Sequence, residues 1–396
     1  MIRTLILLLL AAVPLSAQDA QFFIERIEVR NHKRVSKDVI VAESRLREGR
    51  AYSEEELRDA STRLGRLPFL LSTEFALEKG SERGRHVLVL TVHETRPFFY
   101  LIDAVAYFDP QQGPLTADED SRGATSENLA LGFRWFVGRR GALHVGLSGI
   151  DRNREFAREY GAFSVGYTQY DLFGTRAFAT LNVRQPIEPS GGRLSPQLVV
   201  GVPLSANQTV TVLYDELHTR GLDQRLVTAR WSYNTTNEPF FPTRGSLVYA
   251  GPVAGWLDGT GRGNSRGLVT HSNFIGVEGG AARYFELAER DTVWSDLRAE
   301  WARNDYRASD VPGGRDESTR YGSIGLGYSR SLWSREQRAN GDSRFELTGR
   351  YSRRSRSLEE QSVVFTGRDR EVAQVAGAWV RRSSWGTLRL GVGYAW

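Results

Sequence analysis

Apolar and polar residues alternate with a period of two through most of the chain, from Pro97 to its last residue. In the window 129–137, large apolar side chains such as Phe133 alternate with small or polar ones such as Arg134. The window 227–234 is sorted in the same way. Because successive side chains of a β-strand point to opposite faces, this period predicts strands that each carry one large apolar face.

The polar faces of these windows decide between two kinds of all-β structure. Charged residues inside a dry sandwich core are costly, whereas a water-filled barrel lumen accommodates them. Residues 97–396 hold about sixteen windows, an even number of the kind that bacterial barrels use. The windows around Leu194 and Val363 are the weakest, so about twelve or fourteen strands remain open. The pattern therefore predicts an all-β transmembrane barrel of about sixteen antiparallel strands.

The last window, Gly386–Trp396, alternates without a break between large apolar and small or polar residues. A terminal strand is an exposed edge unless another strand pairs with it. We expect this segment to close the barrel and to act as its assembly signal, paired with the first window at 98–108. An ordinary terminal strand is the alternative. The residues that form the apolar face of the predicted closing strand are Leu388, Leu390, Val392, Tyr394 and Trp396.

Residues 1–17 have the pattern of a secretory signal peptide. Arg3 gives a positive start, and Leu5–Val13 is an apolar core too short to span a bilayer. We expect cleavage after Ala17 and export of the remaining chain. No later window has the apolar run that a transmembrane helix needs.

Residues 22–96 predict a small α+β domain. A strand at 23–29 is followed by a short helix that begins at Ser36. Ser53 and Glu56 form a capping box for a second helix, and two strands follow at 71–77 and 86–93. The predicted order is strand, helix, helix, strand, strand.

Composition excludes several classes of protein. The chain has no cysteine, so disulfide frameworks and thiolate metal sites are absent. The net charge of +5 is modest for 396 residues and gives no case for nucleic-acid binding. The basic residues are almost all arginine, since only Lys33, Lys37 and Lys79 are lysines. Arginine suits lipopolysaccharide phosphates or a charged lumen, although codon bias in a GC-rich genome is the simpler reading.

Candidate chemistry is sparse. The segment Gly263–Gly267 fits the G-x-S-x-G pattern of a hydrolase nucleophile, but it lies in a polar loop instead of between a strand and a helix. The six histidines are scattered without metal-ligand spacing. We therefore predict that the protein is not an enzyme and needs no metal or cofactor.

The segment "WSYNTTNEPFFPTRGSLVYAGP", residues 231–252, is the most specific motif in the chain. Proline fixes a turn there, and Gly245 permits a positive φ. The motif resembles the BamA/TamA family of outer-membrane proteins, in which a strand ending in Tyr-Asn leads into a Phe-Pro-Thr-x-Gly turn. Residues 22–96, with "LVLTVHE" near their end, resemble the POTRA domain of the same proteins. The residues that match the turn motif are Tyr233, Asn234, Phe241, Pro242, Thr243 and Gly245.

The second half of the barrel departs from the family pattern. Members carry a Val-Arg-Gly-(Phe/Tyr) motif on a loop that folds into the lumen, where its arginine pairs with acidic residues. The nearest segment here is Thr319–Gly322, which makes Arg320 the candidate lumen-loop arginine. The order of its residues is scrambled, an ordinary strand start fits equally well, and the acidic partner motif is not evident. These gaps put the insertase activity of the family in doubt.

The resemblance implies an outer-membrane barrel with a periplasmic POTRA-like domain. Its function would be to assemble or translocate outer-membrane or secreted proteins, with a narrow client range because there is one POTRA domain. The implied partners are membrane lipid, lipopolysaccharide, unfolded client proteins and periplasmic accessory proteins, without nucleic acid. A passive pore or structural barrel is the main alternative, and an outer-membrane hydrolase is a third.

Overall fold

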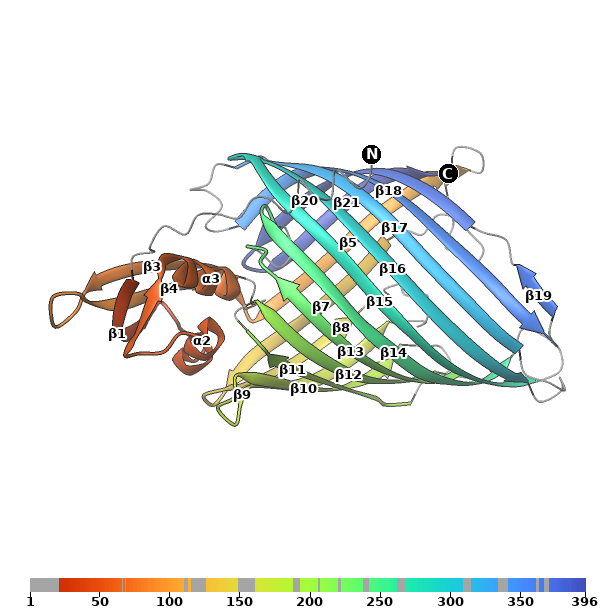
Figure 1. The fold of residues 1–396 in the computed structure, drawn as a ribbon, viewed down its shortest axis with the longest axis horizontal. Helices are drawn as coiled ribbons and strands as arrows, with labels where there is room; N and C mark the ends of the chain where they lie inside the picture. The colour runs from red at the N-terminus through yellow and green to blue at the C-terminus, as the bar shows by residue number, and fades with distance from the viewer. Residues whose placement is uncertain are drawn as a thin grey trace, which may run out of the picture.

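The computed structural model describes a small α+β domain followed by a closed β-barrel (Figure 1). No helix within the described part of the chain is long and apolar enough to cross a membrane. The described residues are 21–65, 67, 69–109, 113–114, 126–148, 161–187, 193–205, 207–219, 222–237, 242–261, 268–308, 315–333, 341–360, 363–366 and 370–396.

The small domain is a four-stranded sheet with two helices. Its sheet order is β2-β1-β4-β3, in which β1 and β4 are parallel and the other neighbours are antiparallel. The predicted elements are confirmed. The structure adds β2, a strand of four residues that is too short to show a period. The elements in chain order are β1 (Gln21–Arg30), α2 (Lys37–Ser44), β2 (Arg50–Ser53), α3 (Glu54–Gly65), β3 (Leu70–Lys79) and β4 (Arg85–Glu94).

Local sequence signals place the two helices. Ser36 caps α2 by accepting a hydrogen bond from the backbone N–H of Asp38 at 3.1 Å. The predicted capping box opens α3. The Glu56 N–H donates to the Ser53 hydroxyl at 3.1 Å, and the Ser53 N–H donates to the Glu56 carboxylate at 2.9 Å. The apolar face of α3 then packs on the sheet, with Leu64 fully buried.

Fifteen strands of the described chain form the barrel wall (Figure 1). Two short strands, β6 (Gly113–Pro114) and β19 (Val363–Thr366), are attached to it. The wall strands are β5 (Phe98–Asp109), β7 (Ser126–Val137), β8 (Gly141–Ser148), β9 (Ala162–Leu172), β10 (Ala177–Pro186), β11 (Ser195–Pro203), β12 (Gln208–Thr219), β13 (Leu222–Asn234), β14 (Gly245–Gly261), β15 (Leu268–Ala288), β16 (Asp291–Ala308), β17 (Arg315–Ser331), β18 (Gly341–Glu360), β20 (Arg370–Ser383) and β21 (Gly386–Ala395).

The outer face of the barrel is apolar, as the period of two predicts. Phe133, Leu326 and Val392 are 45%, 63% and 60% exposed although they are large hydrophobic residues. A soluble protein rarely exposes a continuous belt of this kind, whereas lipid covers it on a membrane barrel. The exposure pattern therefore supports the transmembrane interpretation.

The alternate residues of the same strands pair charges across the lumen face. Arg184 of β10 pairs with Asp215 of β12. Arg350 of β18 donates to Asp296 of β16 at 2.9 Å. These partners lie on strands two apart in the wall, so their side chains cross above the strand between them. The polar faces predicted from the sequence are thus an ion-paired inner surface.

The strand count differs from the predicted sixteen because of the window at Val363. This window forms β19, which pairs in register with the distal end of β18, at Ser357–Glu360. The window near Leu194, which was equally weak, forms the wall strand β11. An odd number of wall strands cannot be antiparallel all round, and β5 and β21 meet in parallel.

Candidate functional site

The seam between β5 and β21 is the candidate site, because it is the parallel contact of the described barrel wall. Nine consecutive register positions pair Gly386–Tyr394 with Tyr100–Phe108. Parallel ladders are slightly less stable per residue than antiparallel ones. The predicted pairing of the first and last windows is confirmed. The two strands run parallel, whereas the sequence predicts an antiparallel barrel.

One ion-pair network bridges the lumen side of the seam. Arg389 of β21 approaches Asp103 of β5 at 3.3 Å and Glu346 of β18 at 3.1 Å. Further along the same face of β21, the residues are Gly391, Gly393 and Ala395, which have little or no side chain to pack against β5. On the lumen face, the charged contact between β21 and β5 is thus made by Arg389.

The seam is fastened at the end of the barrel that carries the small domain, called here the domain end. The Tyr100 N–H donates to the Trp385 carbonyl at 2.9 Å, and the Arg96 N–H donates to the Ser384 carbonyl at 2.7 Å. The Arg96 guanidinium lies 4.7 Å from the centre of the Trp385 ring. At Gly386, with φ of +141°, a Cβ atom would lie 1.9 Å from the Tyr100 carbonyl oxygen. Only glycine fits this close approach.

The predicted closing-strand residues lie on the outer face of β21. Leu390, Val392 and Tyr394 are 45%, 60% and 57% exposed, whereas Leu388 is half-buried. Trp396 is 63% exposed and lies at the end of the barrel opposite the small domain, called here the far end. Its N–H and carbonyl each bond to Ala373 at 3.0 Å.

The small domain docks on the turns at the domain end. Phe69, which precedes β3, packs edge-to-face on Phe136 and Tyr170, with ring centroids 5.1 and 5.7 Å away. Arg382 of β20 donates to the carbonyls of Leu70 and Leu71 at 3.5 and 3.4 Å. Because β20 is the neighbour of β21, this contact holds the start of β3 near the seam. No periodic signal in the sequence marked these residues.

Strand β3 is an edge of the domain sheet, with β4 on its other side. Its distal half is open to solvent, and Leu77 is 38% exposed. An edge strand presents unpaired backbone groups that can add another strand. An edge suited to strand addition therefore starts beside the seam.

The turn motif builds the β13–β14 connection at the domain end. The Asn237 carboxamide accepts from the Thr243 N–H at 3.0 Å and donates to the Thr243 hydroxyl at 2.9 Å. Gly245 has φ of +103°, as the turn chemistry predicts. Tyr233 and Asn234 end β13, and the Asn234 carboxamide oxygen accepts from the Thr236 N–H at 2.9 Å.

The same turn lies against the small domain, since the Asn237 carbonyl oxygen is 3.1 Å from where a Cβ of Gly65 would lie. Pro242 lies within the described turn, whereas Phe241 lies outside the described residues. The hydrolase-like segment Gly263–Gly267 also lies outside them. Among the residues that the structure describes, no group of acidic or histidine side chains could hold a metal ion.

Arg320 lies inside β17, where it faces Trp301 of β16 and Ser355 of β18 in register. It shares the outer face with Ile324 and is exposed, so it is not on a loop in the lumen. The scrambled motif fits a strand because Arg320, Gly322 and Ile324 continue its period of two.

Arg320 belongs to a basic group on the outer face, called here the outer arginine cluster. Its other members are Arg303 of β16 and Arg353 of β18, both exposed, and Arg353 also pairs with Glu371 of β20 at 3.5 Å. By register, each lies diagonally next to Arg320 on an adjacent strand. The cluster follows Trp301 and Tyr351 towards the far end, so it lies just beyond the apolar belt.

No family model and no curated protein matches the chain. Among solved structures, BamA from Haemophilus ducreyi lacking POTRA domains 1–3 is similar to it. The match has a TM-score of 0.37 and 11% sequence identity, and it covers 95% of this chain and 85% of that chain.

Proposed function

We propose that this chain is an outer-membrane barrel that assembles or translocates other outer-membrane or secreted proteins. The small domain faces the periplasm and captures an extended client segment. The barrel then offers the seam between β5 and β21 as a route towards lipid. Resemblance of the turn motif and the domain to the BamA/TamA family suggests this role.

The observation that carries the proposal is the position of the β3 edge. Arg382, one strand from the seam, holds the first residues of β3 by their carbonyls. A client strand added to this edge would therefore start close to β21. Backbone pairing gives affinity without a fixed sequence, which suits unfolded clients.

The seam has features that suit opening. Its ladder is parallel, and on β21 the lumen side beyond Arg389 consists of glycine and alanine. Interior glycine weakens a strand because it has no side chain to pack. Breaking the Arg389–Asp103 contact and the ladder would separate β21 from β5 while the other wall strands stay paired.

A disulfide across the seam tests this mechanism. Ala104 and Leu390 face each other in register on the outer face, and the natural chain contains no cysteine. Oxidised Ala104→Cys/Leu390→Cys protein should fold but lose client assembly in cells, measured by quantifying the outer-membrane proteome, and reduction should restore it. The matched control is Leu347→Cys/Gly377→Cys, which joins β18 to β20. Full activity of the oxidised seam variant would refute the gate.

A passive pore is the second candidate, favoured by the complete ladder along the seam and by the charged lumen. Planar-bilayer recordings separate the two functions. A steady conductance that the seam disulfide leaves unchanged, together with an unaltered outer-membrane proteome after depletion of the protein, would favour the pore.

The outer arginine cluster supports lipopolysaccharide as a lipid partner. Arginine binds phosphate through a planar fork, and tryptophan and tyrosine beneath the cluster are typical of a membrane interface. Replacing Arg303, Arg320 and Arg353 with glutamine should weaken binding of purified lipid A to the detergent-solubilised barrel by at least about tenfold. Unchanged binding would exclude this surface.

A further inference from the structure

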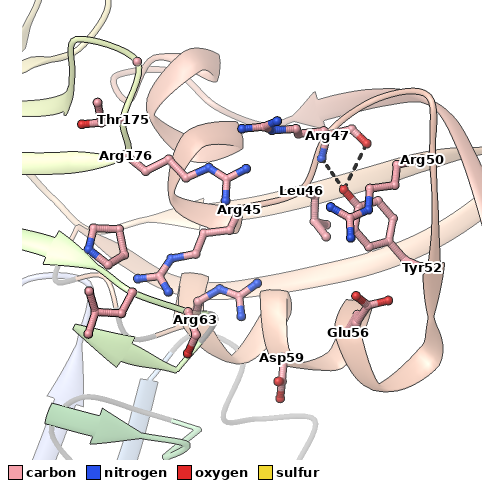
Figure 2. Close-up of a pocket in the computed structure, with 14 residues that line it drawn as sticks. Arg45, Leu46, Arg47, Arg50, Tyr52, Glu56, Asp59, Arg63, Thr175 and Arg176 are labelled. Carbon is pink, nitrogen blue, oxygen red and sulfur yellow. Dashed lines mark hydrogen bonds between the residues drawn. The ribbon is translucent and has the colours of Figure 1, made fainter.

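A pocket of about 340 Å³ lies between the small domain and two barrel turns (Figure 2). The turns are those that follow β9 and β11, at 174–176 and 203–205. The domain wall comes from the end of α2, from β2 and from α3. The pocket is separate from the seam and is lined from both parts of the chain.

Arginine dominates the lining. Five arginines border the pocket, from α3, from barrel turn 174–176, from the segment that joins α2 to β2 and from the first position of β2: Arg45, Arg47, Arg50, Arg63 and Arg176. The lining has two acids, and both have other partners. Glu56 accepts from the Ser53 N–H in the capping box, and Asp59 accepts from Asn207 of the barrel at 3.0 Å. The pocket therefore carries an excess of positive charge.

Arg45 is the central member of this group. It ends α2 in a left-handed conformation with φ of +60°, and Figure 2 shows its side chain in the same pocket as those of Arg63 and Arg176. Its Nη1 atom is buried and has no hydrogen-bond partner. Burial is the main cause that lowers the pKa of Arg45, and repulsion from Arg176 adds to it. The charge of Glu43 opposes the lowering of the pKa. A buried guanidinium nitrogen without a hydrogen-bond partner is costly unless a ligand supplies one.

Acids near the pocket do not cancel this charge. Asp171 accepts from the Arg176 N–H at 2.9 Å and pairs with Arg140 at 3.1 Å, so it is already shared. Burial raises the pKa of Glu43 to about 7, and the Arg45 charge opposes that rise. A carboxyl with this pKa is neutral in part of the population at neutral pH.

We propose that this pocket binds a phosphate group, which bridges Arg45 and Arg63 of the small domain to Arg176 of the barrel. Arginine forks bind phosphate oxygens in pairs, and a volume of this size holds a small phosphorylated group. Leu46, Pro203 and Leu204 give the pocket an apolar side. That side suits the glycerol part of an anionic phospholipid headgroup, although free phosphate offers the same anion.

The consequence concerns the joint between the two parts. Without an anion, arginines from the domain and from the barrel turn repel each other across the pocket. When the anion is bound, its negative charge attracts the arginines of the domain and of the barrel turn together. The domain is then held on the barrel. The ligand would thus set how firmly the domain is held, whichever function the seam performs.

Binding is measured by isothermal titration of the full chain in phosphatidylcholine nanodiscs at pH 7. One arm titrates inorganic phosphate, and a second compares nanodiscs with and without phosphatidylglycerol. Spin labels at Glu55→Cys and Phe173→Cys, both exposed, report the distance between domain and barrel in each arm. Binding of either anion should narrow the distribution of distances between the two labels. A response to inorganic phosphate identifies free phosphate as the ligand, and a response to phosphatidylglycerol identifies the lipid headgroup.

The variant is Arg45→Gln/Arg176→Gln, and the control is Arg58→Gln, a solvent-exposed arginine of α3 outside the pocket. The variant should bind the anion at least about tenfold more weakly and lose the narrowing, whereas the control should match the natural chain. Absence of binding in both arms, or equal binding by the variant, would overturn the proposal. Arg45→Lys keeps the charge but not the fork, so it should bind with intermediate strength. Heat-modifiable migration on gels shows whether each variant is folded. If Arg45→Gln/Arg176→Gln is misfolded, the anion affinity of folded Arg45→Lys tests the proposal, and binding equal to that of the natural chain would overturn it.

Discussion

At the scale of single residues, two positions control contacts that the strand pattern does not specify. Gly386 brings the start of β21 against Tyr100, where the seam begins. Glu43 is half-buried where the small domain meets the barrel, near Arg45, Asp171 and Arg63. One position concerns backbone approach, and the other concerns charge.

Gly386→Ala should destabilise the barrel, because a Cβ would lie 1.9 Å from the Tyr100 carbonyl oxygen and φ is +141°. We expect a loss of about 1–3 kcal/mol in the free energy of unfolding, measured by urea titration in micelles. Gly349→Ala is the matched control, since the nearest atom to its Cβ is 4.0 Å away. Equal effects of the two substitutions would mean that the close approach at the seam is not limiting.

Glu43 should make stability depend on pH in a defined direction. Its pKa is raised from 4.5 to about 7 in the folded protein, mainly by burial. The neutral form is therefore favoured by folding. Its contribution is fully present below pH 4.5 and is lost as pH rises through 7. The urea midpoint should fall over this range in the natural chain and fall less in Glu43→Gln. Glu54→Gln, an exposed acid of α3, should leave the slope unchanged.

At the scale of elements, β3 and β21 have different roles in the proposed function. β3 has one unpaired edge in the domain sheet, whereas β21 is paired on both sides. In the proposed mechanism, β3 would capture the client, and the seam of β21 with β5 would release it towards lipid.

Proline scanning of β3 should separate folding from capture. Successive N–H groups of a strand point to opposite edges, so proline at Thr73 and at Glu74 removes donors from different sides. One substitution should leave the domain folded and weaken binding of an extended aromatic-rich peptide to the full chain. The other should disturb pairing with β4. Thr73→Val keeps the N–H and is the control. Unchanged peptide binding by both folded proline variants would exclude this edge.

At the scale of the whole molecule, the alternation of residues along each strand separates a charged lumen face from an apolar outer face. Charged residues pair across the lumen face, and large apolar residues cover the outer face. The small domain is joined to this wall by the Phe69 contacts, by Arg382 and by the linker bonds at Arg96. The two parts therefore meet through specific side chains as well as through the chain itself.

Single cysteines should report this sorting in the membrane. Cysteine at Arg134 or Arg230, on the lumen face, should react with a small water-soluble reagent. Cysteine at Phe133 or Trp231, on the outer face, should be shielded by lipid. Equal labelling of the two sets would contradict a membrane barrel. Faster migration before boiling than after provides the check that each variant is folded.

The alternating pattern determined the strands and their two faces, and the helix-cap signals determined the helices of the small α+β domain. These features are local, because the period of two and the capping box act between residues a few positions apart. Phe133 and Arg134 could be assigned to opposite faces from their neighbours alone. The positive φ of Gly245 likewise followed from its place in a short turn.

Only the tertiary structure decided how the ends of the barrel meet. The Val363 window forms β19 instead of a wall strand, so the wall has fifteen strands instead of the predicted sixteen. Because this number is odd, the seam is parallel instead of antiparallel. The arginine pocket and the contact of Arg382 with β3 also join residues far apart in the chain. Such contacts depend on closure of the wall and docking of the domain, and no local period encodes them.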